Sequence, residues 1–139
     1  MEPVLTLSAS TRSTAGVLLL AIVAVEYGGW FMLRVVRGSH PATAFQQAFF
    51  RAGHAHAGVL VILALVGQIL ADATLMDGVL AVLARNGIWL AAILMPAGFF
   101  LSATGRDVDV PNRLIWVIYA GALSLAIGAV SLGVALLTA

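Results

Sequence analysis

The sequence predicts an all-α protein, an integral membrane bundle of four transmembrane helices. Of its 139 residues, 62% are hydrophobic and 9% are charged, and its mean hydropathy is +1.07. Soluble domains carry about 25% charged residues, and a chain of this size could not hide so much apolar surface from water. The apolar runs are long and lack the period-two alternation of strands. We therefore expect helices surrounded by lipid.

Four apolar segments are long enough to cross a bilayer, which takes about 20 residues for a core of about 30 Å. The first follows Arg12 and continues past Trp30 without a small-x-small cleavage site, so we expect a retained span and not a signal peptide. The four segments form one transmembrane domain over residues 1–139, and the expected spans are 13–36, 44–71, 78–104 and 113–138.

The connections between these spans are short and contain residues that end helices. Gly38 and Pro41 interrupt the first connection, and Gly105 and Pro111 interrupt the third. The second connection, residues 72–77, is a short polar hairpin. Short connections make neighbouring helices antiparallel.

The arginines predict the orientation of the chain. Cytoplasmic ends of spans carry an excess of basic residues. More arginines flank the first and third connections, so we expect these connections in the cytoplasm and both termini outside. The arginine-rich, lysine-free composition is typical of a high-GC bacterium, which indicates a bacterial cytoplasmic (inner) membrane. A net charge of +1 gives no reason to expect nucleic acid as a partner. Five arginines flank the first and third connections (Arg34, Arg37, Arg51, Arg106 and Arg113), and two flank the N-terminus and the second (Arg12 and Arg85).

A histidine-rich segment early in the second span is the first candidate site. Arg51 and His54 are three residues apart and share a helix face, whereas His54 and His56 lie about 200° apart around the helix. The two histidines therefore cannot readily bind one metal ion from one unbroken helix. Small neighbours such as Gly53 and Gly58 leave room for another helix or a flat ligand.

Other spans also place polar groups in the cytoplasmic half of the membrane. Glu26 of the first span is expected at a depth comparable to that of the histidines, Tyr119 of the fourth somewhat shallower, and Ser102 of the third shallower still. Ionisable residues inside a membrane usually face the protein interior or water. We interpret this pattern as four helices that each offer a polar group to one cluster with His54 and His56. The alternative to a functional site is that Glu26 forms an ion pair with Arg51 or a protonated histidine, which would only stabilise the helix bundle.

Two further patterns leave their roles open. Arg85 is expected to pair with Asp72 or Asp77 near the second connection. A stripe of small residues on the last span indicates close helix packing, either within the chain or between subunits. The stripe consists of Ala120, Ser124, Gly128 and Ser131, with Ala135 beyond.

Two resemblances accompany these residues. Arg51-x-x-His54-x-His56, with residues 96–100 and 111–113, resembles uncharacterised small four-helix membrane proteins of high-GC bacteria, which implies no activity. The histidine helix is also similar to the His-bearing helices of NnrS-type and haem–copper-oxidase-like proteins, which hold haem or copper. A complete oxidase is excluded, because its remaining histidine ligands are absent and the chain is too small.

These observations favour a membrane protein that binds b-type haem or a divalent metal ion. His54 and His56 are the candidate ligands, with Glu26 as a further metal ligand, Arg51 as the partner of a haem propionate and Tyr119 in support. His56 is the histidine that we expect to face inward. The alternatives are a proton-coupled oligomeric transporter or channel, and an accessory subunit of a larger membrane complex. An enzyme is not favoured, since no nucleophile–base motif is present and no cysteine is available.

Overall fold

The computed structural model describes residues 6–74 and 76–138, and it confirms the predicted all-α membrane fold. The described residues form no strands. Each helix is long and apolar enough to cross a membrane, so the chain is a small multi-pass integral membrane protein. The first helix begins earlier than predicted, because the Ser8 side chain accepts a hydrogen bond from the Thr11 amide and caps it. The helices are α1 (Ala9–Val36), α2 (Ala44–Asp72), α3 (Gly78–Ser102) and α4 (Ile115–Thr138).

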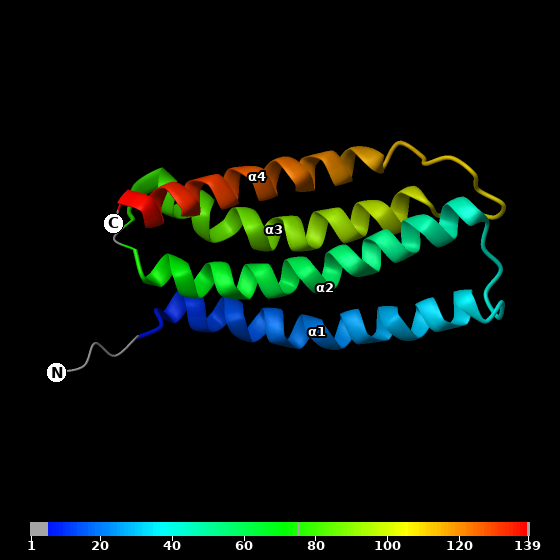
Figure 1. The fold of residues 1–139 in the computed structure, drawn as a ribbon, viewed down its shortest axis with the longest axis horizontal. Coiled ribbons are helices and arrows are strands. Elements are labelled where there is room, and N and C mark those ends of the chain that lie inside the picture. The colour runs from blue at the N-terminus through cyan, green and yellow to red at the C-terminus, as the bar shows by residue number, and fades with distance from the viewer. Residues whose placement is uncertain (1–5, 75, 139) are drawn as a thin grey trace.

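The four helices lie side by side in chain order, each antiparallel to the next (Figure 1). The backbone of α1 closely approaches that of α2, whereas α1 reaches α3 through side chains, as where Phe31 packs near Phe100. Helices α3 and α4 have the most extensive contact. The start of α1 and the end of α4 lie at one end of the bundle, here called the terminal end. The α1–α2 and α3–α4 connections lie at the opposite end, here called the loop end.

Glycines set the close approach of α3 and α4. A Cβ atom added to Gly87 would lie 2.6 Å from the Cα of Gly128, and one added to Gly128 would lie 2.8 Å from the Cα of Gly87. One turn away, the Ser124 hydroxyl donates a hydrogen bond of 2.8 Å to the Gly87 carbonyl oxygen. The small-residue stripe predicted on the last span therefore packs within the chain at Ser124 and Gly128.

A polar network ties three helices together at the terminal end. The Asp72 carboxylate accepts hydrogen bonds of 2.8 Å from the Ser8 amide and 2.8 Å from the Arg85 guanidinium, which also donates to the Thr11 hydroxyl. Of the two predicted partners of Arg85, the structure thus selects Asp72. Asp77 instead precedes α3 as its N-cap residue and makes no side-chain capping bond.

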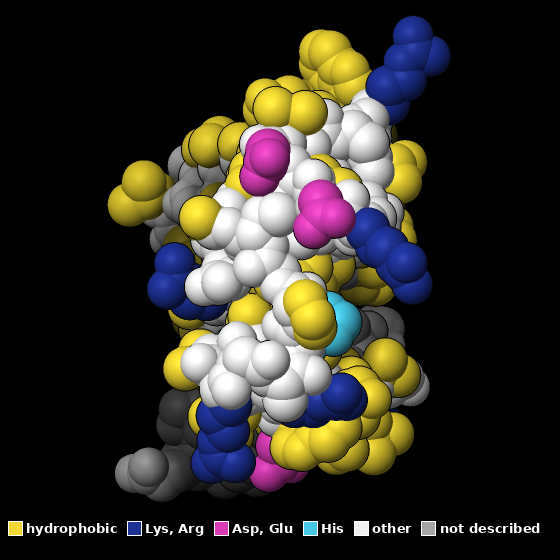
Figure 2. Space-filling view, turned by 90° about the vertical axis from the view of Figure 1, so that its right-hand side faces the viewer, with side chains coloured by type: hydrophobic (Ala, Val, Ile, Leu, Met, Phe, Trp, Pro, Cys, Tyr) yellow, Lys and Arg dark blue, Asp and Glu magenta, His cyan; other side chains and the backbone are white. Residues whose placement is uncertain are grey.

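At the loop end, hydrogen bonds from Gln46 hold the α3–α4 connection against α2. Its buried side chain accepts a hydrogen bond from the Thr43 amide and donates to the carbonyl oxygens of Ala103 (2.9 Å) and Gly105 (3.0 Å). Basic side chains are spread around this end of the molecule (Figure 2). Its assignment to the cytoplasm stays a prediction.

Candidate functional site

The two histidines of α2 face different neighbouring helices. A Cβ atom added to Gly28 of α1 would lie 3.2 Å from Nδ1 of His54, and one added to Gly29 would lie 3.5 Å from its Cε1. The His54 ring therefore occupies a notch that the two glycines leave open in α1. The His56 ring lies against α3 instead, with its centroid 4.9 Å from that of Phe99. The two rings thus point in different directions, as expected from the angle of about 200° around a helix between positions i and i+2.

The backbone of its own helix orients His56. Its Nδ1 lies 2.7 Å from the Ala52 carbonyl oxygen. A carbonyl oxygen only accepts, so Nδ1 carries the hydrogen and donates it. In the neutral ring this leaves Nε2 with a free lone pair. Nε2 makes no hydrogen bond to any described residue, and no buried side-chain nitrogen or oxygen among those residues lacks a partner, so Nε2 is at the surface of the protein.

A series of aromatic rings leads to His56 on the surface that α2 and α3 share. The Phe45 and Phe49 centroids are 4.3 Å apart, those of Phe49 and Phe99 are 5.5 Å apart, and His56 continues the series beyond Phe99. We call Phe45, Phe49, Phe99 and His56 the aromatic row. All four side chains are half-buried, so the row presents a mostly apolar face with one imidazole nitrogen accessible.

Glu26 of α1 and Arg51 of α2 do not form the ion pair that the sequence also allowed as a purely structural contact. Both side chains are exposed. Within residues 6–74 and 76–138, the ion pair that forms is Asp72–Arg85, so Glu26 and Arg51 are not paired there. The His54 side chain likewise makes no hydrogen bond to a described residue, and its ring lies against Gly28 and Gly29.

The structure does not gather the polar groups of all four helices into one cluster. Tyr119 is 53% exposed and packs its ring on Trp116, on the side of α4 opposite Gly128 and therefore away from α3. Ser102 is fully buried and donates to the Phe99 carbonyl oxygen. In the part of the chain that the structure describes, no group of three or more histidine, aspartate or glutamate residues is placed to hold a metal ion.

The residues that the two histidine rings contact were not identified from the sequence, although the sequence contains a pattern that indicates each of the two surroundings. Gly28 and Gly29 form an adjacent pair inside an apolar helix, which is typical of a close approach by another group. Phe45 and Phe49 are four residues apart and His56 follows after seven more, a spacing that places all three on one helix face. Phe99 comes from α3, and only the packing of the two helices brings it to this face.

Comparison with known proteins does not assign the chain to a family. No family model, no curated protein and no solved structure matches the chain.

Proposed function

We propose that this membrane protein binds b-type haem with Nε2 of His56 as an axial ligand. The hydrogen bond from Nδ1 of His56 to the Ala52 carbonyl oxygen, 2.7 Å long, carries the proposal. Metal-ligating histidines almost always donate their other ring hydrogen to a carbonyl or carboxylate, which fixes the tautomer and the orientation of the ring. His56 has this arrangement, and its Nε2 is accessible.

The number of available ligands favours haem over a free divalent ion. A protein site for a divalent ion such as zinc supplies three or four ligands, whereas a haem iron needs one or two axial ligands because the porphyrin supplies the rest. The described residues bring no third histidine or carboxylate to His54 or His56. A divalent ion held by His54, His56 and Glu26 would thus need ligands from a second copy of the chain.

The surroundings of His56 also suit a flat apolar ring. The aromatic row offers ring faces beside the ligand, and the neighbouring Val59 and Leu63 are 64% and 40% exposed toward lipid. One chain supplies one His56, and a symmetric pair of copies would supply one to each side of the ring. One haem per chain would indicate a single axial ligand, and one haem per two chains would indicate a shared one.

The test is an absorption spectrum of the protein purified in mild detergent and reconstituted with haem. We expect a Soret band, and we expect His56→Ala to weaken haem binding roughly tenfold or more, since even residues that only orient a ligand are worth 10–100-fold. His54→Ala is the matched control, because it removes an imidazole that faces α1, and it should keep the band.

Two results would overturn the haem proposal. One is a wild-type protein that stays colourless after reconstitution, and the other is a Soret band that persists in His56→Ala. Elemental analysis of the same sample distinguishes the divalent-ion alternative. A stoichiometric metal without a Soret band, lost in both His56→Ala and Glu26→Gln, would indicate an ion bound between copies.

A second candidate function, proton-coupled transport through an oligomer, is favoured by the position of Glu26. This residue lies ten positions before the end of α1, about 15 Å along the helix axis, and its side chain is exposed on a helix whose backbone closely approaches that of α2 alone. A charge at that depth costs about 2.5–3.5 kcal/mol, so a partner copy, water or a bound proton is needed to offset the cost.

Under this second candidate, we expect proteoliposomes to show a pH-driven proton flux that Glu26→Gln lowers to the level of empty liposomes. The flux is followed with an entrapped pH-sensitive dye. Tyr27→Phe, at the neighbouring exposed position, is the control and should leave the flux unchanged. Equal flux in wild type and Glu26→Gln would rule out Glu26 as the proton carrier.

A further inference from the structure

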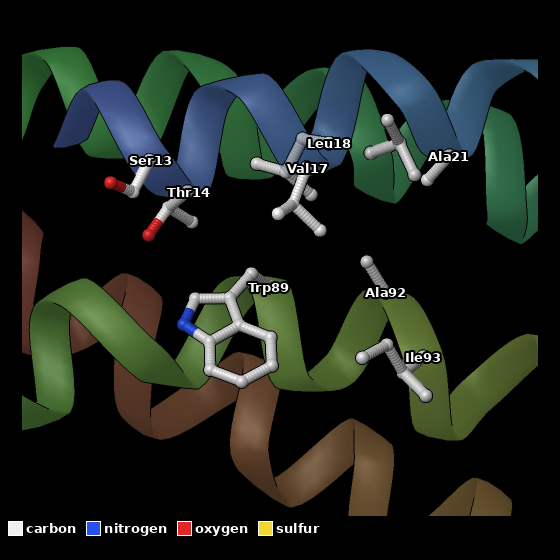
Figure 3. Close-up of a pocket in the computed structure, with 9 residues that line it drawn as sticks. Ser13, Thr14, Val17, Leu18, Ala21, Trp89, Ala92 and Ile93 are labelled. Atoms are coloured by element: carbon white, nitrogen blue, oxygen red, sulfur yellow. The ribbon is translucent and has the colours of Figure 1, made fainter. Parts of the chain in front are cut away.

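We propose that the groove between α1 and α3 is a binding site for one acyl chain of a membrane phospholipid. The groove has a volume of about 320 Å³ and is open along one side. Residues of α1 line one side of the groove and residues of α3 line the other, as Leu18 and Ala92 show (Figure 3), and Val61 of α2 also lines it. No close backbone contact between α1 and α3 closes this space.

Polar groups gather at one end of this groove. Figure 3 shows the hydroxyls of Ser13 and Thr14 and the indole nitrogen of Trp89 toward one end, with Ala21 and Ile93 toward the other. The Trp89 indole already donates to Asn86, but the two hydroxyls make no hydrogen bond to any described residue. The groove thus matches an amphiphile that has a hydrogen-bonding head and an apolar tail.

The length and the direction of the groove fit a phospholipid chain. Ser13 and Ala21 are eight residues apart on α1, which is about 12 Å along the helix axis. One leaflet contributes about 15 Å of hydrocarbon to a bilayer core of about 30 Å. The polar end lies in the first turns of α1, near the membrane surface at the terminal end, where tryptophan side chains are also enriched. An ester carbonyl at that level can accept hydrogen bonds from Ser13 and Thr14.

A helix of a second copy is too wide to lie within the groove and would only cover its mouth. Even with its open mouth included, the free space is about 750 Å³, and over about 12 Å this is roughly 60 Å² in cross-section. An α-helix with its side chains is at least about 10 Å across, or roughly 80 Å². A single hydrocarbon chain is the narrower object, and lipid already surrounds the protein.

The test is native mass spectrometry of the delipidated full-length chain in detergent, titrated with dioleoylphosphatidylglycerol. We expect one lipid to bind per chain with saturation. Ala21→Phe fills the apolar end from α1, and Ile93→Trp fills it from α3 at a position that is 56% exposed and outside the core. Each should weaken binding at least tenfold, whereas the double variant Ser13→Ala/Thr14→Val should weaken it several-fold.

The matched control is Ala126→Phe, which adds the same side chain at an exposed position of α4, and it should leave lipid binding unchanged. Glycerophosphoglycerol, the headgroup without chains, should not bind measurably. Circular dichroism melting of each variant verifies folding. Non-saturating binding, or binding that neither Ala21→Phe nor Ile93→Trp weakens, would show ordinary boundary lipid and overturn the proposal. A dimer that those variants dissociate would also overturn it, in favour of a second copy.

Discussion

Gly128→Val is expected to destabilise the protein by about 3 kcal/mol or more. A Cβ atom at this position would lie 2.8 Å from the Cα of Gly87 and equally close to the Ile88 amide nitrogen. Backbone atoms cannot move aside as a flexible side chain can, so α3 and α4 would have to separate. Overpacking of a well-packed core typically costs 1–3 kcal/mol, and a β-branched side chain against backbone belongs at the upper limit. Separation would also break the hydrogen bond from Ser124 to the Gly87 carbonyl oxygen.

The measurement is thermal or denaturant unfolding in detergent, followed by circular dichroism. Gly133→Val on the same helix is the control, because a Cβ atom there would meet no other atom within 4 Å. It should leave the free energy of unfolding nearly unchanged. If Gly128→Val and Gly133→Val unfolded alike, the close contact between α3 and α4 would be wrong.

Asp72→Ala is expected to cost a similar amount, about 3 kcal/mol, at the terminal end of the bundle. The Asp72 side chain is 4% exposed, and its removal leaves the Arg85 guanidinium without its counter-charge and the Ser8 amide without its acceptor. Loss of one partner of a buried ion pair typically costs 3–5 kcal/mol, because the other charge stays in place without compensation. Since Arg85 is 26% exposed and can reach water, the lower limit applies here.

A double-mutant cycle separates the pair from simple loss of packing. Arg85→Met combined with Asp72→Ala should be less destabilising than the sum of the two single changes, because no unpaired charge remains. Asp77→Ala, an exposed change in the same connection, should have little effect. Additive single changes would show that Asp72 and Arg85 do not act as a pair.

These two contacts indicate how firmly each helix is held. Helix α4 is joined to α3 through backbone approach, and the Asp72–Arg85 pair joins α2 to α3. Helix α1 has close backbone contact with α2 alone, along which the His54 ring fills the glycine notch. The proposed lipid chain would fill the groove that remains between α1 and α3. The lipid groove thus lies along the less extensively packed side of the bundle, whereas His56 lies on the surface that α2 and α3 share.

The sequence by itself determined the fold class, the number of spans and the divergence of His54 and His56. Apolar runs of bilayer length need no tertiary information, because the cost of exposing backbone polar groups to lipid makes such runs helical. The divergence of the two histidines follows from the helical period alone. The short connections likewise required antiparallel neighbours.

Only the tertiary structure decided which way each residue faces. It placed Gly128 against α3, selected Asp72 as the partner of Arg85, and left Glu26 and Tyr119 exposed. In a soluble protein, the apolar stripe of a helix marks its buried face. In a membrane, the lipid-facing side is as apolar as the core, so hydropathy carries no such mark, and the direction of each side chain emerges only when the helices pack.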